Sequence, residues 1–348
     1  MKYLASTSRR TTWLARWIVL PLLCLAFNVA PCAAESVDAA CPDATDASIN
    51  SDASINSLTG TSCLERPQDE LWLVSTRCIG CPQCDVPPAV AVNRLVEHTW
   101  QRSDVGQLTN ALPDRNTITL VYVHGNRVDA GQAVQHGRFV YRKLAPYAPA
   151  ETTLRFVIWS WPSDRIKGQL KDVRAKALRT NNDGYYLGWM LSQFPPDASL
   201  SIIGYSYGAR ITTGGLHVLG GGQVAGCRLS DTVARAPIRV TLLAAAVDRC
   251  WIQPSGAHRY ALGQTDELLN LYNVCDPALK RFGAIEKCYD PVALGYTGTF
   301  TTSLGPDGDK LRQYNMCNSV GKSHDEARFF GSSWSLERMA SNLFWHAD

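Results

Sequence analysis

Residues 199–210, SLSIIGYSYGAR, are a short apolar run that continues into Gly-x-Ser-x-Gly and then into a helix-compatible segment. This order predicts a strand, a sharp turn and a helix, with Ser206 at the turn. A serine hydroxyl is a weak nucleophile at neutral pH, so a protein that uses one must expose it on a tight turn and aim a base at it. The small residues two positions before and after allow such a turn, and Ser206 is therefore a candidate nucleophile.

The hydrophobic pattern around Ser206 places this turn in a layered α/β structure. Apolar runs alternate with helix-length polar segments, which is typical of βαβ units and a mostly parallel sheet. The runs are continuously apolar, as in strands that are covered on both faces. We expect strands at residues 71–77, 118–123, 154–159, 201–203, 240–247 and 268–274, and helices at residues 131–144, 168–193, 207–219 and 334–344.

The N-terminal segment indicates export. Residues 1–34 contain four basic and no acidic residues, an apolar run over residues 17–30, and small residues before Glu35. A membrane span needs about 20 apolar residues, so we expect a signal peptide cleaved after Ala34 and no stable membrane span afterwards. Retention of this segment as an anchor is the alternative. Residues 35–62 are rich in Asp, Ser and Ala and predict a flexible leader, which leaves one domain over residues 63–348.

Charge excludes one class of partner. The whole chain carries a formal net charge of +3, and cleavage after Ala34 leaves 30 Lys and Arg against 31 Asp and Glu, a net charge of −1. The mature protein has no basic bias, so we expect no nucleic-acid partner.

Ten cysteines follow residue 34, five of them before residue 100 and five after residue 220. In an exported chain this number predicts disulfides. If all ten are paired, an odd number of bridges must join the N-terminal segment to the C-terminal half. The alternative is zinc, because the spacing of four cysteines suits thiolate ligands: Cys63, Cys78, Cys81 and Cys84.

Two backbone amides are candidates for an oxyanion hole. The strand expected at residues 118–123 leads into His124, Gly125 and Asn126. A turn at this place and the residue after the nucleophile each supply an N–H group in enzymes built around such a serine turn. We therefore expect the amides of Asn126 and Tyr207 to face a developing negative charge. The side chain of His124 is interpreted as packed in the turn and not as a base.

The acid is expected to follow a late strand, since the chain order in such enzymes is nucleophile, acid, histidine. Asp276 comes directly after residues 268–274, at a turn that Pro277 enforces. Asp248 ends the preceding apolar run and is the alternative acid. Both lie at carboxyl ends of expected parallel strands, where α/β sheets bind ligands.

The base is expected to be His324. His324 and His346 are the histidines that follow Asp276, and His346 lies two residues from the C-terminus, where a rigid base is not expected. An alternative triad would pair His258 with Asp248.

Taken together, the pattern resembles the α/β-hydrolase superfamily, and within it bacterial serine-hydrolase-like proteins with no assigned substrate. The resemblance covers about residue 71 to the C-terminus and is carried by LWLVSTR (71–77), VYVHGN (121–126), WSWPSD (159–164), GYSYGAR (204–210), LLAAAVD (242–248) and NLYNVCDPAL (270–279). It implies the α/β-hydrolase fold, with a mostly parallel central sheet covered by helices on both faces, and the triad Ser206, Asp276 and His324. Tyr207, where many relatives carry Met, and the high cysteine content leave the substrate open.

The sequence thus predicts an exported serine hydrolase. The expected activity is hydrolysis of a small-molecule carboxylic ester through an acyl-enzyme on Ser206, a mechanism that implies no metal or organic cofactor. Two alternatives stay open: a catalytically inert protein that uses the fold for binding or as a scaffold, and an acyltransferase that uses the same three residues.

Overall fold

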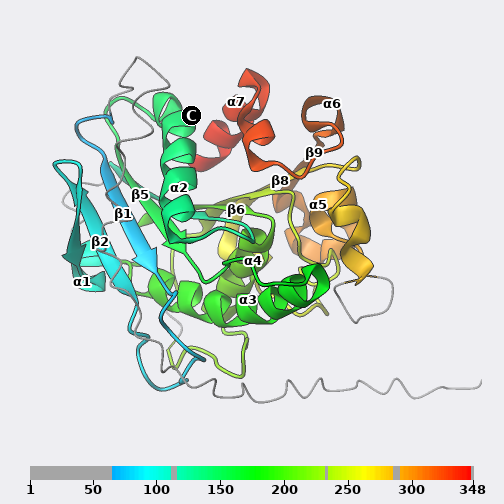
Figure 1. Cartoon of the computed structure of the whole chain (residues 1–348), viewed down its shortest axis with the longest axis horizontal. Coiled ribbons are helices and arrows are strands. Elements are labelled where there is room, and N and C mark those ends of the chain that lie inside the picture. Colours follow the sequence, from blue (N-terminus) through cyan, green and yellow to red (C-terminus); the bar gives the residue numbers. More distant parts are fainter. Residues whose placement is uncertain (1–64, 111–115, 232–233, 285–290, 346–348) are drawn as a thin grey trace, which may run out of the picture. The chain divides into compact units, whose positions relative to one another are not determined.

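The computed structural model describes residues 65–110, 116–231, 234–284 and 291–345 of the 348-residue chain (Figure 1). The expected signal peptide at residues 1–34 and the leader at residues 35–62 lie outside these ranges, as do Cys41, Cys63 and Cys288. The domain boundaries drawn from the sequence therefore stay predictions.

Within the described residues, nine strands form one sheet in the order β3-β2-β1-β5-β4-β6-β7-β8-β9. Seven strands, from β1 to β9 in this order, pair in parallel, whereas β2 and β3 form an antiparallel hairpin on β1. The strands are β1 (Glu70–Ser75), β2 (Ala91–Val96), β3 (Thr99–Ser103), β4 (Thr117–Val123), β5 (Thr153–Ser160), β6 (Ser199–Tyr205), β7 (Ile238–Leu243), β8 (Thr265–Tyr272) and β9 (Leu311–Asn315).

Helices cover both faces of the sheet. The helices α2 (Ala130–Leu144) and α7 (Ser333–Leu343) lie on one face, and α3 (Gln169–Ser192) and α4 (Tyr207–Leu219) lie on the other (Figure 1). The expected α/β class and the four long helices are confirmed. The other helices are short: α1 (Val105–Asn110), α5 (Leu294–Thr297), α6 (Cys317–Val320) and 3-10 turns at Ala145–Tyr147, Leu262–Gln264, Leu279–Ala284, Thr301–Lys310 and Glu326–Phe330.

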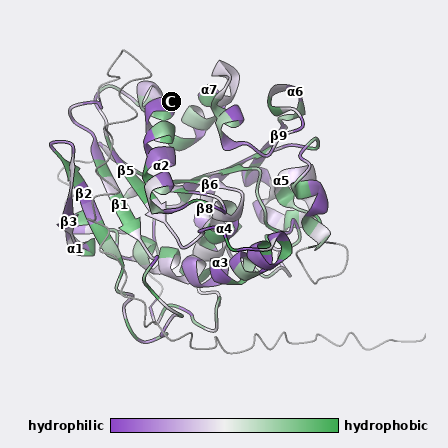
Figure 2. Ribbon diagram, in the orientation of Figure 1, coloured by the Kyte–Doolittle hydropathy of each residue, from purple (hydrophilic) through white to green (hydrophobic). Residues whose placement is uncertain are grey.

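The core lies between these layers. All seven residues of the central strand β4 are buried, as expected for a strand with helices on both sides. On α2 the buried positions recur at helical spacing and leave a hydrophilic outer face, which Figure 2 shows beside the hydrophobic strands. The hydrophobic residues expected in the strands therefore form one continuous core.

Glycines allow α3 and α4 to pack at close range. A Cβ atom on Gly188 of α3 would lie 2.8 Å from the carbonyl oxygen of Gly215 on α4, and one on Gly184 would lie 3.3 Å from Cα of Gly214. Larger side chains at these positions would push the helices apart. This contact fixes the position of α4, the helix that begins directly after Ser206.

The sequence missed three strands and drew three others past their observed ends, the one at residues 240–247 by the most. Strands β2, β3 and β9 lie at or next to the edges of the sheet and mix buried with partly exposed residues, so they lack the continuous apolar runs that marked the others. The strand expected at residues 240–247 ends at Leu243, because Ala244 adopts a left-handed backbone with φ of 45° that breaks the ladder.

Disulfides link distant parts of the chain. Cys84 is bonded to Cys227 across 143 residues, so one bridge links the N-terminal segment to the C-terminal half. A second bridge joins Cys275 to Cys317. Cys78 and Cys81 are disulfide-bonded as well, so the zinc site considered for these cysteines is contradicted.

Pairing of all ten cysteines is not found, since Cys250 is free and exposed. No helix within the described ranges is long and apolar enough to cross a bilayer.

We predict that replacing Cys84 and Cys227 together by serine lowers the free energy of unfolding by about 5 kcal/mol, because the bridge closes a very long loop in the unfolded chain. Guanidinium denaturation measures the change, and Cys250→Ser serves as the matched control because its thiol is free. Equal unfolding midpoints for the double variant and the control would contradict this role of the bridge.

Candidate active site

Ser206 occupies a strained turn between β6 and α4. Its backbone has φ of 53° and ψ of −114°, a conformation that a residue with a side chain rarely adopts. The Ser206 amide donates to the carbonyl of Leu243 at 2.9 Å, and the Ser206 carbonyl accepts from the amide of Ala246 at 3.0 Å. The end of β7 and the loop after it therefore hold the turn in place.

The two glycines of the motif are required by close packing. A Cβ atom on Gly208 would lie 2.0 Å from the carbonyl oxygen of Val123, and one on Gly204 would lie 2.9 Å from Cα of Ala209. Both distances are shorter than van der Waals contact, so a side chain at either position would displace the turn. The spacing of Gly-x-Ser-x-Gly thus follows from the packing of α4 against β4.

Three of the predicted site residues form one hydrogen-bonded chain. The Oγ atom of Ser206 lies 2.9 Å from Nε2 of His324, and Nδ1 of His324 lies 2.6 Å from Oδ2 of Asp276. The Asp276 side chain is completely buried, whereas the His324 side chain is 26% exposed. The structure therefore brings together a hydroxyl, an imidazole and a carboxylate that are far apart in the sequence.

Backbone amides orient the Asp276 carboxylate. Its Oδ1 atom accepts hydrogen bonds from the amides of Ala278 at 2.8 Å and Leu279 at 3.0 Å, in the turn that begins at Pro277. These bonds leave Oδ2 for His324. Amide donors stabilise the charged form of a carboxylate, so Asp276 is prepared to accept a hydrogen bond from an imidazole.

The loop that carries His324 is tied to the loop that carries Asp276. The side-chain amide of Asn273 donates to the carbonyls of Gly321 at 2.9 Å and Ser323 at 3.1 Å. The disulfide between Cys275 and Cys317 joins the residue before the acid to the short helix before the histidine loop. Sequence reasoning missed Asn273, although Cys275 beside Asp276 was a visible sign of a constrained loop.

Tyr205 contacts the same histidine from the nucleophile side. Its hydroxyl donates to the carbonyl of His324, and the two rings lie 5.4 Å apart. Burial raises the pKa of Tyr205 well above its usual value, so the hydroxyl keeps its proton as a donor. Tyr205, the last residue of β6, thus links this strand to His324.

Both segments expected to form an oxyanion hole lie beside Ser206. Tyr207 is the first residue of α4, and a Cβ atom on Gly125 would lie 3.3 Å from Cβ of Ser206. Asn126 follows Gly125 directly, so its amide and that of Tyr207 belong to the two backbone segments that flank the serine. The arrangement suits two donors directed at one oxygen.

His124 is packed in the turn, in agreement with its interpretation from the sequence. Its ring stacks on Trp161 at 5.7 Å, and its Nε2 accepts from the Trp161 amide at 3.3 Å. Nδ1 therefore carries the proton and donates to the carbonyl of Gly125 at 2.8 Å. Burial lowers the pKa of His124 well below its usual value, so the ring is neutral and acts as a support for Gly125.

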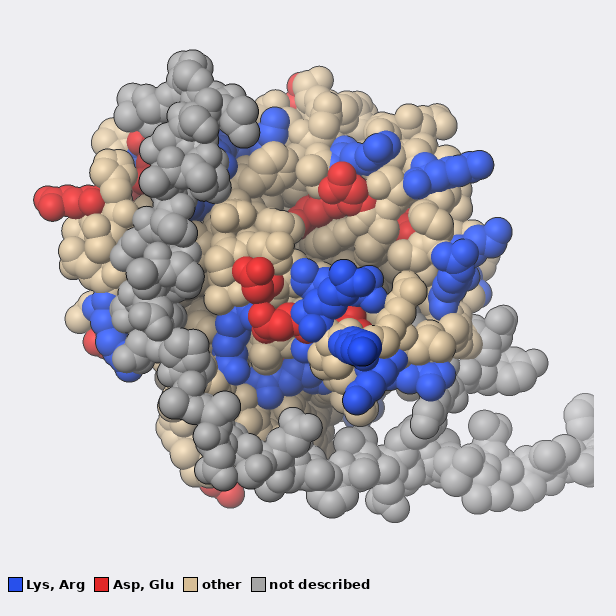
Figure 3. All heavy atoms as spheres, viewed as in Figure 1, with Lys and Arg blue, Asp and Glu red and all other residues tan. Residues whose placement is uncertain are grey.

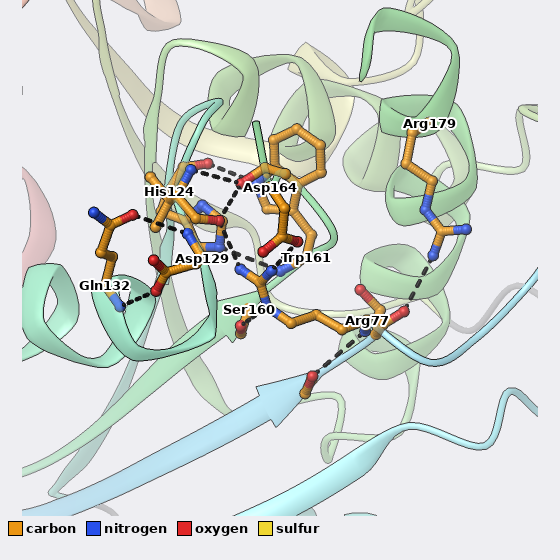
Figure 4. A network of polar contacts seen from close by, with 12 residues as sticks. Arg77, His124, Asp129, Gln132, Ser160, Trp161, Asp164 and Arg179 are labelled. Carbon is orange, nitrogen blue, oxygen red and sulfur yellow. Dashed lines mark hydrogen bonds and ion pairs between the residues drawn. The ribbon is translucent and has the colours of Figure 1, made fainter. Parts of the chain in front are cut away.

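Arg77 braces the neighbouring loops from the end of β1 (Figure 4). Its guanidinium donates to Oγ of Ser160 at 2.7 Å, to Oδ2 of Asp164 at 2.7 Å and to the carbonyl of Val128 at 2.9 Å. One side chain thus connects β5, the loop after it and the turn that contains Asn126. None of these bonds could be read from the sequence, because they join segments that lie up to 87 residues apart.

The alternative acid and base, Asp248 and His258, contact other groups. Nδ1 of His258 is 2.9 Å from Oγ1 of Thr213 on α4, and the ring packs edge-on against Trp251 at 4.7 Å. Oδ1 of Asp248 accepts from the amide of Cys250 at 2.9 Å. His258 therefore supports the packing of α4, while His324 contacts Ser206.

Comparisons with known proteins add little to this geometry. No protein-family model matches the chain, and no curated protein sequence matches it. It is similar to solved structures of esterase B from Lactobacillus rhamnosis. One, with a tributyrin phosphonate inhibitor, is 12% identical in sequence with a TM-score of 0.33, and the match covers 81% of this chain and 88% of the esterase chain. Another inhibited form is 11% identical with a TM-score of 0.34, and the match covers 80% of this chain and 89% of the esterase chain.

We predict that Gly208→Ala lowers the free energy of unfolding by about 3 kcal/mol, because the added methyl group overlaps the carbonyl of Val123. Gly263→Ala is the matched control, since no atom lies within 4 Å of its added Cβ. Urea denaturation of both variants checks the difference. Equal stability would show that α4 does not press against β4 as described.

Proposed function

We propose that the protein is a serine hydrolase of the α/β-hydrolase fold that cleaves carboxylic esters. The observation that carries this proposal is the unbroken chain from Ser206 Oγ through His324 to the buried Asp276, with separations of 2.9 and 2.6 Å. The strained backbone at Ser206 supports it, since such strain persists where the surrounding structure holds a residue for a function. An inert scaffold would gain nothing from this arrangement.

The first half of the proposed reaction forms an acyl-enzyme. The Nδ1–H group of His324 donates a hydrogen bond to Asp276, so the proton stays on Nδ1 and the Nε2 lone pair takes the proton from Ser206 as Oγ attacks the acyl carbon. The amides of Asn126 and Tyr207 stabilise the oxygen that becomes negative. The tetrahedral intermediate then collapses, and the alcohol leaves with the proton carried by His324.

The second half releases the acid. Water enters, loses a proton to Nε2 of His324 and attacks the acyl carbon on Ser206. Collapse of the second intermediate breaks the bond to Oγ, which recovers its proton from the imidazolium. Asp276 stabilises the imidazolium in both halves and keeps its own negative charge.

Export of the protein is part of the proposal. The proposal keeps the division predicted from the sequence: a signal peptide at residues 1–34, a leader at residues 35–62 and a catalytic domain at residues 63–348. The bridges Cys84–Cys227 and Cys275–Cys317 support it, because disulfides form and persist in oxidising compartments. The proposed substrate is a small-molecule ester.

We predict that the wild-type protein hydrolyses 4-nitrophenyl butyrate and that Asp276→Asn lowers kcat by about 10⁴-fold, because the amide no longer holds the histidine in the required tautomer. Asp248→Asn is the matched control and should retain most of the activity, since Asp248 binds the amide of Cys250. Release of nitrophenolate measures both. A wild-type protein without activity, or the reverse order of damage, would contradict the proposal.

A further inference from the structure

A basic pocket lies at the start of α3. Its volume is about 440 Å³, and it is lined by Arg127, Arg165, Ile166, Lys167, Gly168 and Gln169. Three of these residues are cationic. On the side of the molecule drawn in Figure 3, Lys and Arg side chains gather over the region of α3, with a few acidic side chains among them. We refer to these six residues as the basic pocket.

The basic pocket is directly connected to the turn beside Ser206. The buried carboxylate of Asp172, in the first turn of α3, accepts from Nε of Arg127 at 2.8 Å and from the amide of Ile166 at 3.0 Å. The same carboxylate accepts from Nδ2 of Asn126 at 3.3 Å. Asn126 is a proposed oxyanion donor, so one buried side chain joins the wall of the pocket to the reaction centre.

The other proposed oxyanion donor contacts the same turn of α3. The hydroxyl of Tyr207 donates to the carbonyl of Val173 at 2.9 Å, one residue after Asp172. Both segments that flank Ser206 are therefore attached to the first turn of α3. The basic pocket and the two segments beside Ser206 are thus attached to the same turn of α3.

The charges around the basic pocket do not cancel. Burial raises the pKa of Asp172, but hydrogen bonds from Arg127 and Ile166 and the charge of Arg127 lower it by more, so Asp172 is ionised and balances one cation. The nearby Asp164 forms an ion pair with Arg77 at 2.7 Å. Arg165 and Lys167 are exposed at the rim and add positive charge.

The start of α3 adds to this field. Its N-cap residue is Gly168, and no side chain of the described residues caps the helix there. The first amides of a long helix carry a partial positive charge and favour an anion. They reinforce the cationic side chains of the pocket.

We propose that the basic pocket binds an anionic group of the substrate, so that the preferred ester carries a carboxylate or phosphate a few bonds from the scissile acyl carbon. This proposal rests on the function proposed for Ser206 and names the class of substrate. Arg165 and Lys167 would contact the anionic group, and Arg127, held by Asp172, would face it from the wall.

Matched esters test the proposal. The ratio of kcat/KM for mono(4-nitrophenyl) glutarate to that for 4-nitrophenyl hexanoate is measured for the wild-type protein and for the double variant Arg165→Ala and Lys167→Ala. We expect the ratio to fall about tenfold in the double variant, and to fall in the wild type as salt is raised, because charge-assisted contacts are lost or screened. Arg142→Ala, an exposed position in the last turn of α2, is the control and should not change the ratio. A ratio that is equal in all three proteins would overturn the proposal.

A binding measurement separates this proposal from the one for Ser206. Inorganic phosphate is titrated calorimetrically into Ser206→Ala with and without the two pocket substitutions. Binding that is about tenfold weaker in the triple variant supports the basic pocket even if neither ester is hydrolysed, a result that would contradict the function proposed for Ser206. Equal or absent phosphate binding in both proteins, with no charge preference among esters, overturns the basic pocket.

Discussion

The left-handed backbone at Ser206 is the constraint on which the candidate site depends. A φ of 53° at a residue with a side chain is costly, and here it is held from several sides. Leu243 at the end of β7 and Ala246 in the following loop bind the serine backbone, and Gly208 of α4 packs against the end of β4. Close packing of α4 on α3 completes this support. The hydroxyl is fixed in direction before any substrate arrives, which is the condition for efficient attack.

The rest of the candidate site lies on loops, which hold a fixed position only when other contacts restrain them. The proposed acid, Asp276, follows β8, and the proposed base, His324, lies on a loop after α6. The Cys275–Cys317 bridge and the side-chain amide of Asn273 keep the two loops together. On the opposite side, Asp172 connects Asn126 with the start of α3. The same buried carboxylate thus holds a proposed oxyanion donor and one wall of the basic pocket, so the proposed binding and the proposed chemistry share a support.

The sequence predicted the features that depend on residues close together in the chain. The apolar run, the turn and the helix around Ser206 are adjacent in sequence, and the central strands are apolar because both faces are covered. Asp276 and Asp248 both follow neighbouring strands, so the sequence favoured Asp276 but left Asp248 open as the alternative. The contact with His324 depends on a loop whose path the chain order does not specify. Nothing in the sequence indicated the roles of Asn273, Arg77 and Asp172, because each forms hydrogen bonds to residues far away in the chain. Strands β2, β3 and β9, which lie at or next to the sheet edges, were missed because partly exposed strands carry polar residues.

Covalent labelling of Ser206 tests the central claim most directly. A fluorophosphonate reacts with a serine only when a base and an oxyanion hole activate it, so the reaction reports on the assembled site without knowledge of the substrate. The account predicts stoichiometric labelling of the wild-type protein, with the adduct mapped by mass spectrometry to the peptide that contains Ser206, and no labelling of Ser206→Ala. A folded wild-type protein that does not react, or a label on another residue that persists in Ser206→Ala, would contradict it.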